Sequence, residues 1–147
     1  MSTSTPHHFI CPICEKEPES HSFVELSHNS ETRTRIFYTC PAAAKKYDDY
    51  EGILVHYDGI LSECGDAPWI WVFDAKGFST KHLLEIRVGI GLAKLITTKY
   101  SHNLEKICVI NANRYIFMAH HIIKNFLPQK VNDSILICGT DHGFTTD

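Results

Sequence analysis

The chain has 147 residues, of which 44% are hydrophobic, and its 14 basic and 17 acidic side chains give a formal net charge of −3. This length fits one domain, or one domain with a small appendage, and the apolar fraction argues against a disordered protein. The near-neutral charge excludes a global attraction to nucleic acid or acidic membranes, no apolar run reaches the roughly 18 residues of a membrane span, and residues 1–10 lack the pattern of a secretion signal. We therefore expect a protein of the reducing cytoplasm.

The first 48 residues are polar and contain a Cys-x-x-Cys motif, Cys11-Pro12-Ile13-Cys14. Two thiolates presented by one tight turn are typical of a zinc knuckle. The alternative is that Cys11 and Cys14 are reduced surface thiols that hold no metal. We favour zinc, in a closed structural site.

A β-hairpin supplies candidates for the remaining ligands, because residues 22–27 and 33–39 are β-prone and flank a turn. If the hairpin is centred between Ser30 and Glu31, His21 lies opposite Cys40 at the open end, within about 5.5 Å. His28 would lie at the turn, about 23 Å along the strand. The predicted zinc ligands are therefore Cys11, Cys14, His21 and Cys40, with Cys64 or His28 as replacements.

Residues 49–147 alternate between helical and strand-like apolar patterns. Their order after a first helix is strand, helix, strand, helix, strand, which predicts parallel pairing with right-handed crossovers. Near-continuous apolar strands indicate a sheet covered on at least part of both faces. We predict an α/β fold with a small, mainly parallel sheet over residues 49–147, preceded by the zinc-binding hairpin segment over residues 1–48. The predicted helices are 50–62, from Ser79 or Thr80 to Tyr100, and from Asn111 or Asn113 to Leu127; the predicted strands are 69–74, 107–110 and 135–138.

Three stretches of this second part resemble a known family. They are WVFDAKGFS (71–79), KYSHNLEKICVINANRYIF (99–117) and HIIKNFLPQKVNDSILICG (121–139). Their order and motifs, a strand ending in Asp before a Gly, a strand ending in Asn-Ala and a helix with Lys-x-Phe-Leu, are similar to the CRAL-TRIO lipid-binding domain. The chain is thus identified as carrying a shortened domain of this type.

The resemblance implies a site and a function. Members bind one hydrophobic or amphipathic molecule between the sheet and a mobile helix, which corresponds here to residues 114–127, with Trp69–Asp74 on the pocket floor. From the residues alone, the alternating aromatic side chains of this strand are equally well core or floor. The implied ligand-binding residues are Trp71, Phe73, Tyr115, Met118, Ile122 and Phe126, and the implied ligand is a lipid or another small hydrophobic molecule.

Departures from the family pattern leave other functions open. Members that recognise phosphoinositide headgroups carry Glu and Lys where this chain has His102 and Ser134. The segment KYSHNL (99–104) resembles the BCH subgroup, which mainly binds proteins. The first alternative to a lipid carrier is therefore a protein-docking scaffold of the same fold without a ligand, for example a component of a virion.

A second alternative is nucleic-acid binding. Residues 33–41, RTRIFYTCP, faintly resemble the GRF-type zinc finger, and Arg33, Arg35 and Tyr38 could contact a single strand. Catalysis is not expected, because Asp141-His142 has no nucleophile motif nearby and no acid–base pair emerges elsewhere. The sequence thus favours a non-catalytic binding module.

Overall fold

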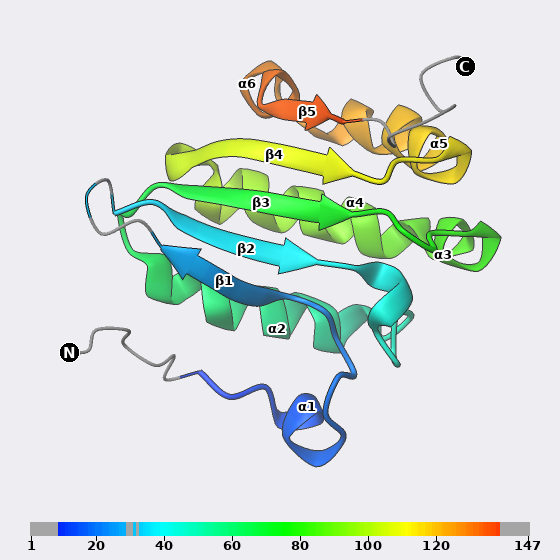
Figure 1. The fold of residues 1–147 in the computed structure, drawn as a ribbon, viewed down its shortest axis with the longest axis horizontal. Helices are drawn as coiled ribbons and strands as arrows, with labels where there is room; N and C mark the ends of the chain where they lie inside the picture. The colour runs from blue at the N-terminus through cyan, green and yellow to red at the C-terminus, as the bar shows by residue number, and fades with distance from the viewer. Residues whose placement is uncertain (1–8, 29–30, 32, 139–147) are drawn as a thin grey trace.

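The computed structural model of the chain describes residues 9–28, 31 and 33–138, and these build one five-stranded sheet in the order β1-β2-β3-β4-β5 (Figure 1). β1 pairs with β2 antiparallel, and β2 to β5 are all parallel. The predicted α/β fold with a mainly parallel sheet is confirmed. The strands are β1 (Val24–His28), β2 (Arg35–Thr39), β3 (Trp69–Asp74), β4 (Leu104–Ile110) and β5 (Ile135–Ile137).

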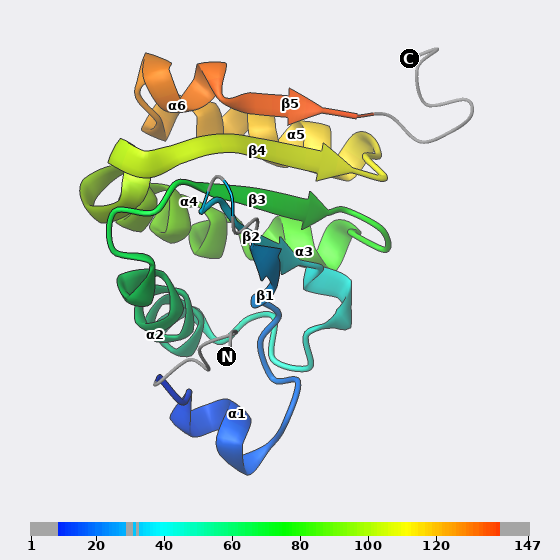
Figure 2. The same cartoon turned by 60° about the vertical axis from the view of Figure 1, so that its left-hand side comes forward.

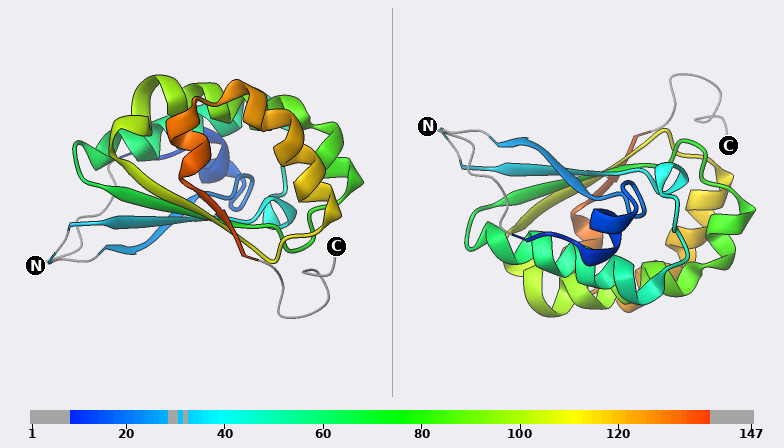
Figure 3. Two further views of the ribbon diagram at one scale, coloured as in Figure 1. Left: turned by 90° about the horizontal axis from the view of Figure 1, so that it is seen from above. Right: turned by 90° about the horizontal axis from the view of Figure 1, so that it is seen from below.

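The helices that connect the parallel strands lie together on one side of the sheet (Figure 3). This arrangement follows from right-handed crossovers between strands that are added in sequence order. α1 lies apart from this layer, beside α2 (Figure 2). The helices are α1 (Pro12–Lys16), α2 (Tyr50–Leu61), α3 (Thr80–Leu84), α4 (Ile86–Leu95), α5 (Arg114–Ile123) and α6 (Gln129–Asp133); a π-helical turn (Ile96–Tyr100) extends α4, and 3-10 turns cover Pro41–Ala43, Ser62–Cys64, Ser101–Asn103 and Lys124–Phe126.

Side-chain caps fix where three helices begin. Asp49 accepts a hydrogen bond from the Gly52 N–H at the start of α2. Asn113 accepts bonds from the second and third backbone amides that follow it at the start of α5, which decides between the two predicted caps. Ser79 and His82 form a capping box at α3. Each cap satisfies an amide that has no partner within its helix.

The main core lies between the sheet and the helices and is strongly aromatic. Phe23 stacks on Phe37, with ring centroids 5.2 Å apart, and on Tyr57 of α2 at 4.0 Å. Trp69 and Trp71 point to the same side from β3 and are buried. Successive residues of a strand face opposite sides, so alternate residues supply this core: Phe37 of β2, Trp69 and Trp71 of β3, and Ile107 and Val109 of β4, joined by Leu104 at the start of β4, where the pairing with β3 shifts by one residue.

The other face of the sheet is mainly apolar but includes the exposed Lys106, which pairs with Ile70, and none of the described helices covers it (Figure 3). Ile70 and Val72 lie there half-buried, while Val24 and Leu136 at the two edges are each 51% exposed. The prediction that both faces are at least partly covered is therefore wrong for the described residues. The strands are apolar on both sides even though helices occupy one.

The predicted hairpin exists, but it is a direct continuation of the parallel sheet. Arg35 to Thr39 of β2 pair in register with Trp69 to Phe73 of β3. The boundary expected between residues 48 and 49 thus falls in the connection between two hydrogen-bonded strands. None of the described helices is long and apolar enough to cross a membrane.

Candidate metal centre and apolar cavity

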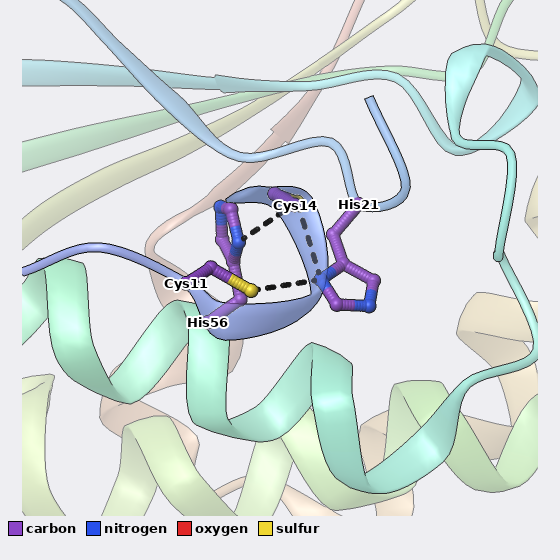
Figure 4. A group of neighbouring side chains, drawn as sticks. All are labelled: Cys11, Cys14, His21 and His56. Carbon is purple, nitrogen blue, oxygen red and sulfur yellow. Dashed lines mark hydrogen bonds between the residues drawn. The ribbon is translucent and has the colours of Figure 1, made fainter. Parts of the chain in front are cut away.

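Two cysteines and two histidines converge next to α2: Cys11, Cys14, His21 and His56 (Figure 4). One potential ligand atom from each lies within 4.8 Å of all the others. The Nδ1 atom of His21 is 3.5 Å from the Cys11 sulfur and 3.6 Å from the Cys14 sulfur, and the Nδ1 atom of His56 is 3.7 Å from the Cys14 sulfur. In a tetrahedron with Zn–S of about 2.3 Å and Zn–N of about 2.05 Å, sulfur and nitrogen are about 3.6 Å apart. The spacing of the cluster therefore fits one metal ion.

The cluster joins three separate segments of the chain. Cys11 caps α1 and Cys14 lies within it, so one short helix presents both sulfurs. His21 lies in the connection between α1 and β1, and His56 lies in the middle of α2. An ion at this point would tie the first described residues to the helix layer.

Both imidazoles are oriented by a second hydrogen bond. The Nε2 atom of His21 is 2.8 Å from the Asp49 carboxylate, and the Nε2 atom of His56 is 2.9 Å from the Phe23 carbonyl oxygen. A carboxylate and a carbonyl only accept, so each Nε2 carries the proton and each Nδ1 directs its lone pair into the cluster. This is the tautomer that a metal-bound histidine needs.

Burial shapes the ionisation of the centre. Cys11, His21 and His56 are each less than 8% exposed. Burial lowers the pKa of His56, which keeps the imidazole neutral and able to bind a metal. Burial also raises the pKa of the Cys14 thiol, with the nearby Cys11 sulfur adding to the effect. A cation is therefore needed to hold both sulfurs as thiolates.

Three of the four predicted ligands, Cys11, Cys14 and His21, come together, and Cys40 does not. The Cys40 sulfur lies beside the Lys76 carbonyl oxygen, at 3.7 Å, and the Cys40 N–H donates to the Ser22 hydroxyl. The predicted pairing of His21 with Cys40 is wrong, because β1 pairs with β2 one residue out of the predicted register, with Val24 opposite Tyr38, and this places Ser22 next to Cys40. A one-residue shift sends side chains to opposite faces.

His56 was missed, and neither proposed replacement for Cys40 joins the cluster. Cys64 is buried at the far end of α2, and His28 lies at the far end of β1. His56 stands 42 residues after Cys14, inside a helix whose neighbours Ile53, Tyr57 and Ile60 are buried. The sequence signal for His56 was a histidine on the apolar side of a helix. Its position next to the cysteines depends on the tertiary structure.

A second feature is a cavity of about 190 Å³ between the sheet and the helix layer. Its walls are mainly aliphatic and aromatic side chains from β3, β4, β5, α4 and α5. His21 lines one end, so the cavity reaches the cluster of cysteines and histidines. The lining includes Trp71, Phe73, Val109, Ile116, Ala119 and Ile123.

Two of the predicted ligand-binding residues, Trp71 and Phe73, line the cavity. The four on α5 and its continuation do not: Tyr115 lies at the edge of the core, and Met118, Ile122 and Phe126 are 51%, 40% and 42% exposed. The inward face is formed instead by Ile116, Ala119 and Ile123. The predicted face lies one residue, about 100° around the helix, from the face that lines the cavity, because both stripes are apolar and periodicity cannot choose between them.

Three histidines, His21, His82 and His120, are among the polar residues that line the cavity. Burial lowers the pKa of His82 and of His120, so both are neutral at pH 7. His82 is 6% exposed, and its Nδ1 atom is 3.1 Å from the Ser79 backbone N–H. Its Nε2 atom has no hydrogen-bond partner in the described part of the chain.

Asp74, at the carboxyl end of β3, is fully engaged in structural bonds. It accepts from the Tyr38 hydroxyl at 2.5 Å, from the Asn111 side chain at 3.0 Å and from the Lys76 N–H at 3.0 Å. Burial by itself would raise the pKa of Asp74, but these bonds together lower it. The carboxylate joins β2, β3 and the turn after β4, which is a structural role.

Comparison with known proteins agrees with this architecture. The family model for the CRAL/TRIO domain matches residues 30–145. A crystal structure of Sfh5 is similar, with a TM-score of 0.63 and 12% sequence identity over 84% of this chain, which spans about half of Sfh5 (49%). None of the curated proteins matches the sequence. The family match covers most of the sheet and of the helix layer described above, and the chain therefore belongs to the CRAL/TRIO domain family.

Proposed function

We propose that the protein is a non-catalytic module that binds one small hydrophobic or amphipathic molecule of the lipid class. The observation that carries this proposal is the apolar cavity between the sheet and α4 and α5, in a chain of the CRAL/TRIO domain family. The full engagement of Asp74 in structural bonds supports a binding role without catalysis.

The size of the cavity limits what it holds without rearrangement. A cavity of about 150 Å³ accommodates benzene, so a volume of about 190 Å³ holds roughly seven carbon atoms. At about 0.8 kcal/mol per buried CH₂, seven carbons contribute about 6 kcal/mol, which corresponds to a Kd on the order of 10–100 µM. A complete phospholipid would require movement of the helix layer, since pockets for larger ligands measure about 300–1,000 Å³.

A pair of neighbouring substitutions on α5 tests the cavity. Ala119→Leu adds three carbons to a side chain that lines it, whereas Met118→Leu changes an exposed neighbour by little. We expect wild-type protein and Met118→Leu to bind benzyl alcohol equally in an NMR titration and Ala119→Leu to bind it at least tenfold more weakly, with melting confirming that each variant folds. The proposal fails if wild-type protein binds neither a small aromatic probe of this size by NMR nor a larger amphiphile, such as a phospholipid or retinoid, by native mass spectrometry.

A specific observation favours a second candidate, a docking scaffold that pairs with another copy of itself. A mainly parallel sheet is normally covered on both faces, and here one apolar face is open among the described residues. The area of this face follows from the dimensions of the sheet. Five strands spaced about 4.8 Å apart, with an average length of about five residues and a rise of about 3.3 Å per residue, give about 400 Å² per chain. Two copies face to face would cover about 800 Å², slightly below the roughly 1,000 Å² of a stable interface, so the pair would be weak.

Sedimentation velocity at rising protein concentration tests this second candidate. Leu136→Lys places a charge on the open face, and Leu84→Lys, at a residue 76% exposed outside the sheet, is the matched control. A weak dimer that Leu136→Lys abolishes and Leu84→Lys preserves would support self-association. A monomer up to millimolar concentration would exclude it, and binding of a different protein to the same face would replace it.

For the cluster of cysteines and histidines we propose a structural Zn²⁺ ion. Two thiolates and two imidazoles suit zinc, and a set of four protein ligands leaves no open position for catalysis. All six cysteines are free thiols, which fits the reducing cytoplasm that we propose as the compartment. Elemental analysis of protein purified without added metal should give about one zinc per chain, and a folded, metal-free protein would contradict the assignment.

A further inference from the structure

His82 has its ring orientation and tautomer fixed by the start of α3. It occupies the third position of the capping box, and its Nδ1 atom lies 3.1 Å from the backbone N–H of Ser79. A backbone N–H can only donate, so Nδ1 must accept and, in the neutral imidazole, the proton sits on Nε2. Burial lowers the pKa of His82 and so supports the neutral form. The ring packs against Phe78 and Tyr47, with centroid distances of 5.3 and 4.9 Å.

The resulting Nε2–H donor is buried and unsatisfied. His82 is 6% exposed and lines the cavity, and no acceptor for Nε2 exists among the described residues. Unsatisfied buried donors are rare because each one loses its bond to water without a replacement. A donor left without a partner at the wall of an apolar cavity indicates that its acceptor belongs to a bound molecule.

We infer that His82 is a ligand-binding residue whose Nε2–H donates a hydrogen bond to an oxygen atom of the ligand. This inference rests on the cavity of the proposed function. The ligand class is therefore an apolar molecule with an oxygen acceptor, in contrast to a plain hydrocarbon.

The charge of the cavity wall narrows this class further. The described residues that line it include the carboxyl group of Glu85 but no lysine or arginine. A neutral imidazole offers one hydrogen bond and no positive charge, and a buried carboxylate without a cationic partner is strongly disfavoured. The ligand oxygen thus belongs to an alcohol, ester or ketone and not to a carboxylate.

Three probes of similar shape test the inference: benzene, benzyl alcohol and benzoate, each titrated by NMR against the full chain. We expect wild-type protein to bind benzene and benzyl alcohol, and benzoate at least tenfold more weakly. His82→Phe keeps an aromatic ring and removes the donor. The affinity for benzyl alcohol should therefore fall about fivefold to tenfold, the usual net effect of one hydrogen bond, while the affinity for benzene changes by less than about twofold. Ser79→Ala weakens the same helix cap and leaves the His82 donor in place, so the affinity for either probe should not change.

The outcomes separate this inference from the proposed function. If wild-type protein binds none of the probes and no larger amphiphile, the cavity proposal itself fails. If benzene binds but His82→Phe weakens benzyl alcohol no more than benzene, the role of His82 is overturned while the cavity proposal stands. Should His82→Phe not fold, imidazole nitrogen–proton correlation spectra of the wild type decide. A proton on Nε2 whose signal shifts with benzyl alcohol and not with benzene supports the inference, and a proton on Nδ1 overturns it.

Discussion

His56 and Cys40 offer a decisive comparison. In the structure His56 is the fourth member of the cluster of cysteines and histidines, whereas the hairpin pattern of the sequence predicts Cys40 in that place. The perturbations are His56→Ala and Cys40→Ser. The Nδ1 atom of His56 lies 3.7 Å from the Cys14 sulfur, whereas the Cys40 sulfur lies beside the Lys76 carbonyl oxygen. We therefore expect loss of metal affinity from the histidine variant and none from the serine variant.

The expected loss of zinc affinity follows from the contribution of one ligand to the binding free energy. Structural zinc binds with about 10–16 kcal/mol in zinc-finger peptides, so one of four ligands contributes about 2.5–4 kcal/mol. At about 1.4 kcal/mol per factor of ten, His56→Ala should weaken zinc binding by roughly 60-fold to 700-fold. The variant also leaves the Phe23 carbonyl oxygen without its partner, which costs about 1–3 kcal/mol of folding stability independently of the metal.

Competition with a chromogenic chelator measures the affinity, and thermal melting with excess chelator separates the two effects. Metal-free wild-type protein and metal-free His56→Ala should differ only by the lost bond to the Phe23 carbonyl oxygen and the lost packing of the buried ring against Phe9 and Tyr57. Metal-loaded wild-type protein should melt higher than both, since an ion that binds only the folded state stabilises it. The ligand assignment is refuted if Cys40→Ser loses zinc, or if His56→Ala retains wild-type affinity.

Three further predictions concern reactivity, acid stability and nucleic acid. Burial raises the pKa of Cys64 to about 11, so iodoacetamide at pH 7.5 should label the exposed Cys138 at least tenfold faster, as read by peptide mass spectrometry. For Asp58, burial alone would raise the pKa, but bonds from Lys99 and Tyr100 lower it below its ordinary value. The stabilisation is complete above the ordinary carboxyl pKa near 3.9 and should be lost as the pH falls through the folded pKa, and Asp58→Asn should flatten this decline in acid melting curves. With a net charge of −3, binding to oligonucleotides should be weaker than micromolar at physiological salt, and a tight, salt-sensitive gel shift would contradict this.

Local features of the sequence determined the elements and their order. Asn113 and Ser79, each one of two candidates that the sequence offers, cap α5 and α3, because a short polar side chain satisfies free amides where a helix begins. The alternation of strand and helix patterns predicted parallel pairing. A crossover helix brings the chain back to the end of the sheet where the previous strand began, so the next strand runs parallel to it. The Cys-x-x-Cys motif identified two members of the cluster, since their relative position depends on one turn of chain.

Features that depend on contacts between distant segments were decided by the tertiary structure alone. α5 is apolar on two neighbouring stripes, so its periodicity allowed either face inward, and packing against the sheet selected Ile116 and Ala119. The fourth cluster residue is His56 and not Cys40, because the pairing of β1 with β2 places Cys40 next to Ser22, while α2 brings His56 next to the cysteines. The periodicity of apolar residues indicates which side chains are buried, whereas only the tertiary structure determines which of them are in contact.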